Sequence, residues 1–155
     1  MKANLVLTAQ LLTIGLIFYA PFYEFEYSNL DLEPLSVHFI IGLISIFLGA
    51  FLFLASIFTM STNFEVRAKQ RSTSELVTKW PFSWVRNPIY LSGVFLSFGW
   101  SLFFLSLYAF MSSVLLIIIL LIKVSLEEKF LTQQFGEPYK KYLKQVPRII
   151  PRSLF

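Results

Sequence analysis

The sequence predicts an all-α integral membrane protein with about four transmembrane helices, followed by a short amphipathic helical segment on the cytoplasmic side. Of the 155 residues, 56% are hydrophobic and only 14% are charged, whereas an ordinary soluble domain has about 25% charged residues. The apolar residues form long uncharged runs that reach or exceed the roughly 20 residues needed to cross a bilayer. Acidic and basic residues are segregated between these runs. We therefore expect a single membrane domain over residues 1–155.

The first two predicted spans cover residues 3–23 and 36–60. Neither contains an aspartate, glutamate, lysine or arginine. In the second span, small residues recur on one helical face, which lets a neighbouring helix approach closely. These small residues are Gly42, Ser45, Gly49 and Ser56.

The third and fourth spans lie in one uncharged run, residues 87–122, which is 36 residues long. As a single helix it would extend about 54 Å, far more than the hydrocarbon core of about 30 Å. The run must therefore fold back as a hairpin, with its reversal near residues 106–108 and spans over 88–106 and 108–126. Lys123 can extend to the interface, so the fourth helix can continue into the aqueous phase.

The distribution of charge predicts the orientation. Residues 24–33 contain four acidic residues and no basic one, whereas residues 65–86 contain five basic residues and residues 129–152 contain six. The positive-inside rule then places both termini and the 61–88 loop in the cytoplasm. The net charge of +4 is explained by orientation and by contact with anionic headgroups. We expect membrane lipids as partners and no nucleic acid.

The chain has no cysteine and one histidine, which excludes disulfides, thiolate metal sites and multi-histidine metal sites. We therefore predict no metal.

The C-terminal part predicts two short helical stretches beyond the fourth span. Apolar residues fall at helical spacing up to Phe135, Gly136 suits a helix end, and Pro138 suits the first turn of the next helix. Pro147 stops that helix. The basic tail lies against the membrane or folds over the cytoplasmic mouth of the bundle. The residues of the first stretch are Leu126, Phe130, Leu131 and Phe135, and those of the second are Tyr139, Tyr142, Leu143 and Val146.

Glu127 and Glu128 lie where the fourth span returns to water. Carboxylates at a membrane boundary are costly unless they stay hydrated or meet a cation. A ligand site and a solvated helix end both explain the pair. Adjacent helical residues point about 100° apart, so the two glutamates are expected to do different jobs.

Four motifs resemble one superfamily of membrane methyltransferases, the isoprenylcysteine carboxyl methyltransferase and phospholipid methyltransferase group. They are VRNPIYL over residues 85–91, the glutamate pair, FGEPYKKY over 135–142 and VPRIIP over 146–151. The resemblance covers residues 78–152, which we expect to be the cofactor-binding half. Three positions depart from it: Asn87 replaces the histidine of the isoprenylcysteine branch, and Trp80 and Ser83 stand where a glycine and a basic residue are expected.

The resemblance implies a helical bundle that binds S-adenosylmethionine from the cytoplasmic side while a lipidic substrate enters from the bilayer. The acceptor would be an isoprenylcysteine-like carboxylate of a prenylated substrate or a phospholipid amine. An amine needs a base, whereas a carboxylate does not.

The resemblance also implies roles for individual residues. Arg86 and Glu127 are the expected catalytic residues: Arg86 as a forked cation for a carboxylate of cofactor or substrate, and Glu127 as the base if Glu128 holds the cofactor ammonium. An interfacial charge that only sets the topology is the other explanation for Arg86. Gly93 could allow close approach of the cofactor or could simply serve helix packing. The expected cofactor-binding residues are Asn87, Pro88, Tyr90, Gly93, Glu128, Tyr139, Tyr142 and Arg148. Amphipathic packing explains Tyr139, Tyr142 and Arg148 equally well.

Two other functions remain open from the sequence. A nicotinamide-dependent sterol reductase has a similar Arg-x-Pro-x-Tyr segment and a tyrosine-rich terminal helix, but the glutamate pair and the short chain count against it. A non-catalytic membrane protein that binds lipid would account for the departures at Trp80 and Ser83.

Overall fold

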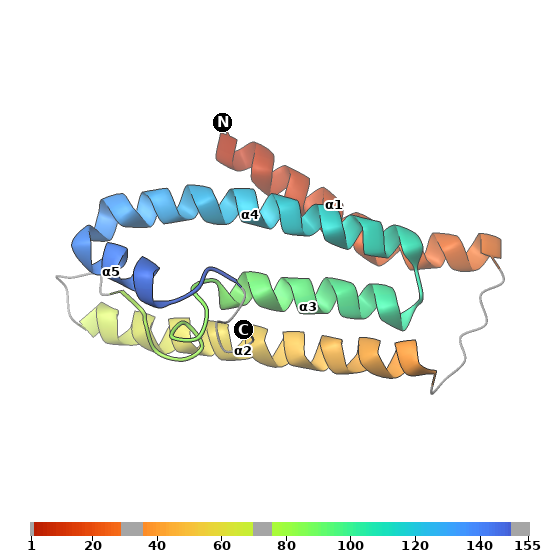
Figure 1. The fold of residues 1–155 in the computed structure, drawn as a ribbon, viewed down its shortest axis with the longest axis horizontal. Helices are drawn as coiled ribbons and strands as arrows, with labels where there is room; N and C mark the ends of the chain where they lie inside the picture. Colours follow the sequence, from red (N-terminus) through yellow and green to blue (C-terminus); the bar gives the residue numbers. More distant parts are fainter. Residues whose placement is uncertain (1, 29–35, 70–75, 150–155) are drawn as a thin grey trace.

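The computed structural model describes residues 2–28, 36–69 and 76–149. Within these ranges the regular structure is entirely helical, which confirms the predicted all-α class. Four long helices lie side by side and a short fifth helix lies across one end of them (Figure 1). The helices are α1 (Lys2–Ser28), α2 (Val37–Lys69), α3 (Pro88–Phe103), α4 (Leu107–Phe135) and α5 (Glu137–Gln145).

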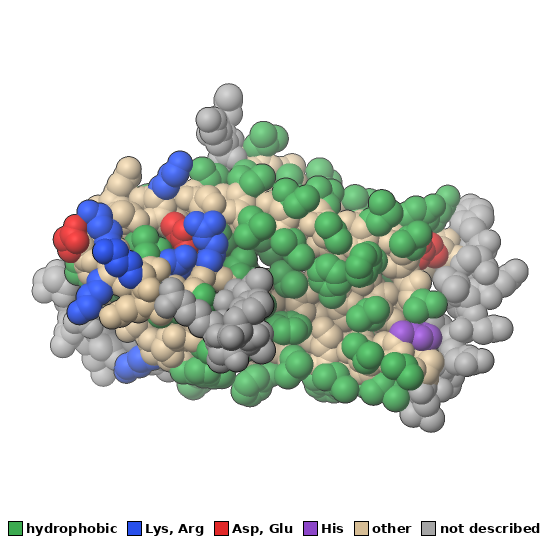
Figure 2. All heavy atoms as spheres, viewed as in Figure 1, with side chains coloured by type: hydrophobic (Ala, Val, Ile, Leu, Met, Phe, Trp, Pro, Cys, Tyr) green, Lys and Arg blue, Asp and Glu red, His purple; other side chains and the backbone are tan. Residues whose placement is uncertain are grey.

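The helices present an apolar surface to their surroundings. The segments Asn4–Glu24, Val37–Ser61 and Leu107–Phe135 are each long and apolar enough to cross a membrane, while α3 is apolar but only 16 residues long. Large hydrophobic side chains cover the face seen in Figure 2, and Phe58 on α2 is 71% exposed. So large an apolar surface is typical of a protein that is surrounded by lipid.

Small residues bring α2 and α3 into backbone contact. A Cβ on Gly42 would lie 2.8 Å from the carbonyl oxygen of Gly99, and one on Gly99 would lie 2.8 Å from the backbone nitrogen of Ile46. The Ser45 hydroxyl donates a hydrogen bond to the Phe95 carbonyl of α3, at 2.8 Å. The face of small residues predicted for the second span is therefore the interface with α3.

The predicted reversal after the third span is also confirmed. Helix α3 ends at Phe103, Leu105 adopts a left-handed φ of 52°, and α4 begins at Leu107. The Ser106 hydroxyl caps α4 by accepting from the Ala109 N–H at 3.0 Å. Glu24 of α1 accepts from the Tyr108 N–H at 3.0 Å, where a negative charge also favours the helix dipole.

At its other end, α4 continues past both glutamates to Phe135, and Gly136 makes the turn into α5 with a φ of 62°. Pro138 lies in the first turn of α5, as predicted. Within α4, Leu126 and Phe130 are exposed. The buried cluster at this end contains Tyr139, Tyr142 and Val146, packed against Leu76, Leu131, Phe135 and Leu143.

The hairpin brings the start of α3 and the end of α4 to the same end of the bundle, beside α5 and the end of α2 (Figure 1). Lysine and arginine side chains gather at this end, whereas the rest of the visible face is mostly apolar (Figure 2). The described part of the tail folds over this end, where Ile149 packs against the Leu52, Val85 and Leu91 cluster. Residues 150–155 lie outside the described residues.

Candidate functional site

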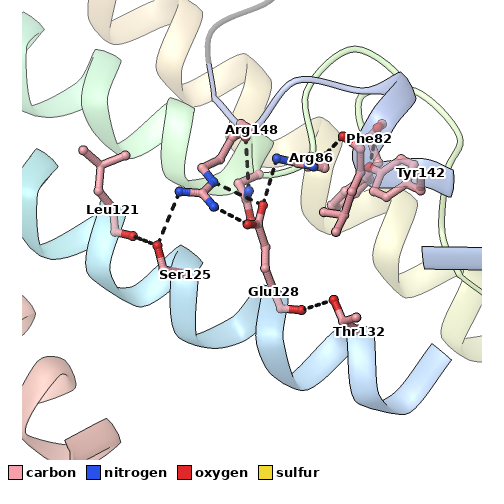
Figure 3. Close-up of polar contacts among 10 residues, drawn as sticks. Phe82, Arg86, Leu121, Ser125, Glu128, Thr132, Tyr142 and Arg148 are labelled. Atoms are coloured by element: carbon pink, nitrogen blue, oxygen red, sulfur yellow. Dashed lines mark hydrogen bonds and ion pairs between the residues drawn. The ribbon is translucent and has the colours of Figure 1, made fainter. Parts of the chain in front are cut away.

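The centre of the site is the carboxylate of Glu128, which projects from α4 between two arginines (Figure 3). Its Oε1 lies 3.0 Å from a terminal nitrogen of Arg86, and its Oε2 lies 2.5 Å from a terminal nitrogen of Arg148. Glu128 is only 8% exposed. A carboxylate buried to this extent requires cations or hydrogen-bond donors, and these two arginines provide them.

Arg86 comes from the loop before α3 and connects three parts of the chain. Besides Glu128, it donates from its side chain to the Leu143 carbonyl at 2.9 Å and from its backbone N–H to the Pro147 carbonyl at 2.9 Å. Its Nε is buried and has no hydrogen-bond partner among the described residues. Arg86 therefore joins α4 to α5 and the tail.

Asn87 and Pro88 set the start of α3. Pro88 is fully buried in the first turn of α3, where its missing N–H costs nothing. Asn87 precedes the helix, but its side chain does not cap it. The amide instead donates to the Arg148 carbonyl at 3.1 Å, so Asn87 holds the tail that carries the second arginine.

Two buried tyrosines of α5 lie beside the arginines. The Tyr142 hydroxyl donates to the Phe82 carbonyl at 2.6 Å, which ties α5 to the loop before α3. The Tyr139 ring lies 5.9 Å from the Tyr142 ring, centroid to centroid. Burial, and next the charge of Glu128, raises the pKa of Tyr139 above its usual value. Burial likewise raises the pKa of Tyr142, so both phenols keep their protons at neutral pH.

A recess of about 210 Å³ opens beside these residues. Its wall is mainly aromatic and aliphatic, with Arg86 and Asn87 as its polar members. An apolar pocket with a few polar groups is the usual form of a small-molecule site. The recess is lined by Met60, Leu76, Val77, Phe82, Arg86, Asn87, Leu131, Phe135, Tyr139 and Tyr142.

Glu127 belongs to a separate polar cluster between α1, α3 and α4. The Tyr90 hydroxyl of α3 donates to Glu127 Oε1 at 2.6 Å. Lys123 Nζ lies 5.3 Å from the centroid of the Tyr90 ring and donates to Gln10 Oε1 of α1 at 3.0 Å. The two adjacent glutamates therefore have different partners.

Most of the candidate residues from the sequence come together at this end of the bundle, whereas Gly93 borders open space. It lies one turn beyond Tyr90, and a Cβ added there would meet no atom within 4 Å. Gly99, in contrast, is a packing position against α2.

Sequence reasoning missed the contributions of Gln10, Ser125 and several carbonyl groups. Ser125 accepts a hydrogen bond from Arg148 at 3.3 Å, and its spacing of three residues before Glu128 was an available signal. Gln10 is a polar residue within an apolar run, which could have marked it. Nothing in the sequence indicates that the carbonyls of Leu143 and Pro147 turn towards Arg86.

Residues 37–138 match the sequence profile of the phospholipid methyltransferase family. This segment includes α2, α3, α4 and the glutamate pair. The chain belongs to the phospholipid methyltransferase family. Neither the curated proteins nor the solved structures include a significant match.

Family membership is consistent with the resemblance carried by the four motifs and with a membrane protein whose substrates are lipids. The matched segment ends at Pro138, so most of α5 and the tail with Arg148 lie beyond it. It also begins after α1. The structure, rather than the family match, therefore connects four further residues with the glutamate pair: Gln10, Tyr139, Tyr142 and Arg148.

Proposed function

We propose that this protein transfers a methyl group from S-adenosylmethionine to a membrane lipid, and that it binds the cofactor at the end of the bundle beside α5. The observation that carries this proposal is the buried Glu128 carboxylate flanked by Arg86 and Arg148. These groups are complementary to an amino acid zwitterion, which has one ammonium and one carboxylate.

The charges and the shape of the site fit such a ligand. Two guanidinium groups and one carboxylate provide groups of opposite charge for the carboxylate and the ammonium of the ligand. The buried Nε of Arg86 offers an additional donor. The aromatic wall of the recess, with Phe82, Tyr139 and Tyr142, suits a flat ring system such as adenine.

We assign the cofactor contacts as follows. Glu128 binds the ammonium, and Arg86 and Arg148 bind the carboxylate. Asn87 and Pro88 fix the start of α3 and hold the tail, while Tyr139 and Tyr142 form the wall against the ring. S-adenosylmethionine supplies a methyl group that is already activated on a sulfonium. The task of the protein is therefore to orient the acceptor and to exclude water, and orientation alone can lower a barrier by about 7–11 kcal/mol.

The acceptor is assigned to the other polar cluster. Glu127, held by the Tyr90 hydroxyl, is the residue that can take a proton from an amine. We favour a phospholipid amine over an isoprenylcysteine-like carboxylate for two reasons. The matched family is the phospholipid branch, and Asn87 replaces the histidine of the other branch.

The first test is a titration of the detergent-purified protein with S-adenosylmethionine and, separately, with NADPH, recording the thermal unfolding midpoint. A ligand that binds the native state raises this midpoint by mass action. We expect S-adenosylmethionine alone to raise it in a saturable way. Stabilisation by NADPH alone would support the reductase, and stabilisation by neither would support a non-catalytic lipid-binding protein.

The two glutamates provide a matched pair of variants. We expect Glu128→Gln to weaken S-adenosylmethionine binding by about tenfold or more, because a charge-assisted hydrogen bond contributes about 1.5–3 kcal/mol. Glu127→Gln should leave cofactor binding unchanged and lower methylation of an amine acceptor by about 10²-fold or more. Wild-type cofactor affinity in Glu128→Gln would contradict the assignment.

A further inference from the structure

Lys123 is a charged residue inside the apolar part of α4. It follows the 36 uncharged residues of 87–122 and lies one helical turn before Glu127. An ionisable side chain at membrane depth is costly, and it therefore marks a candidate binding site.

The partners of Lys123 leave its charge unbalanced. Its ammonium donates to the neutral amide of Gln10 at 3.0 Å and lies over the ring of Tyr90. No ion pair joins it to an acidic residue in the part of the chain that the structure describes. An ammonium has three donors, so Lys123 can bind an anionic group without giving up the Gln10 contact.

Glu127 has the complementary arrangement. Its carboxylate accepts from the neutral Tyr90 hydroxyl at 2.6 Å, and it too forms no ion pair within the described residues. Tyr90 contacts both charged groups, with its hydroxyl at Glu127 and its ring beneath Lys123. One site thus holds a cation and an anion that form no direct ion pair with each other.

The order of the two charges along α4 matches the order of groups in a lipid headgroup. Four helical residues correspond to a rise of about 6 Å, and Glu127 is nearer to α5 and the basic end of the molecule. Lys123 is nearer to the bilayer centre. In a phospholipid, the phosphate likewise lies on the bilayer side of the group that it carries.

We propose that Lys123, positioned by Gln10 of α1, binds the phosphodiester of a lipid acceptor and so presents the headgroup to Glu127. This inference rests on the proposed function and extends it to the acceptor. Helix α1 precedes the segment that matches the family, so Gln10 gives α1 a place in the site. Figure 1 shows the N-terminal end of α1 diverging from α4.

The test is a lipid titration of the full-length protein in detergent, with thermal unfolding as the readout. The probes are dihexanoylphosphatidylethanolamine, dihexanoylglycerol with the same chains but no phosphate, and inorganic phosphate. The variants are Lys123→Gln, the charge-retaining Lys123→Arg, and Lys129→Gln as a matched control, because Lys129 is an exposed lysine of the same helix.

We expect the phospholipid to stabilise the wild type, Lys123→Arg and Lys129→Gln, and Lys123→Gln to require at least about tenfold more of it. Equal stabilisation of Lys123→Gln would overturn the proposal. So would equal stabilisation of the wild type by dihexanoylglycerol, or by inorganic phosphate alone.

S-adenosylmethionine titration of the same samples separates this proposal from the proposed function. Unchanged cofactor binding by Lys123→Gln would show that the variant is folded and that only the lipid contact is lost. If the wild type fails to bind S-adenosylmethionine, the methyltransferase proposal fails, while the lipid titration still decides whether Lys123 binds a phosphate. If Lys123→Gln does not fold, Gln10→Leu takes its place as the test variant. Loss of stabilisation by the phospholipid in Gln10→Leu would support the site, whereas unchanged stabilisation would contradict the positioning of Lys123 by Gln10.

Discussion

The neighbouring carboxylates of Glu127 and Glu128 have different environments because of their positions on α4. Glu128 meets Arg86 from the loop before α3 and Arg148 from the tail, whereas Glu127 faces α3 and meets a phenol. Two guanidinium groups occupy both carboxylate oxygens of Glu128, whereas the carboxylate of Glu127 has one neutral partner, the Tyr90 phenol, among the described residues. This difference is the basis for assigning one glutamate to the cofactor and the other to the acceptor.

The two tyrosines of α5 also differ in their hydrogen-bond partners. This difference allows a test of which contact holds α5 against the loop before α3. The Tyr142 hydroxyl bonds the Phe82 carbonyl, whereas the Tyr139 hydroxyl makes no hydrogen bond to the described residues. We expect Tyr142→Phe to destabilise the protein by about 1 kcal/mol, which lowers the thermal unfolding midpoint by about 2–4 °C. Tyr139→Phe is the control and should leave the midpoint unchanged. An equal fall in both variants would show that the Phe82 contact does not hold α5.

Helix α3 is the central element of the bundle. It packs along α2 through glycine contacts, it packs on α4, and Tyr90 and Val94 on its surface contact the Ile17, Leu116 and Leu120 cluster that joins α1 to α4. Because Arg86 and Asn87 directly precede α3, the packing of this helix sets the position of the site. A change in the α2–α3 interface should therefore affect stability and the site together.

Two glycines of α3 provide a comparison at this level. A Cβ at position 99 would lie within 3 Å of backbone atoms of α2, whereas a Cβ at position 93 would meet no atom within 4 Å. We expect Gly99→Ala to cost about 1–3 kcal/mol, because backbone atoms must move apart, and to lower the unfolding midpoint by about 2–12 °C. Gly93→Ala should leave the midpoint unchanged. If Gly93→Ala nevertheless weakens S-adenosylmethionine binding, the backbone at this position lies close to the cofactor.

At the scale of the whole molecule, the order of helices and the place of the hairpin could be predicted from the sequence. Hydrophobic length requires the reversal before α4, and turn residues such as Gly136 and Pro138 mark the start of α5. The contacts between distant segments could not be predicted, because no periodicity relates Gln10 to Lys123 or Asn87 to the Arg148 carbonyl. The third span was predicted over residues 88–106, but α3 ends at Phe103, because Leu105 and Ser106 form the turn into α4.

The whole molecule has one basic end, which contains the candidate site, and an opposite end at the α3–α4 turn. The positive-inside rule predicts that the basic end is cytoplasmic, where a soluble cofactor would reach Glu128. Because the chain has no cysteine, single-cysteine variants can test this directly with a membrane-impermeant maleimide. In a bacterial host, we expect Lys141→Cys to be labelled only in inverted vesicles and Leu105→Cys, in the α3–α4 turn, only in intact spheroplasts. The reverse pattern would place the site on the outer face and would require a different source of methyl donor. Labelling of both positions from one side would mean that α3 and α4 do not cross the membrane as a hairpin.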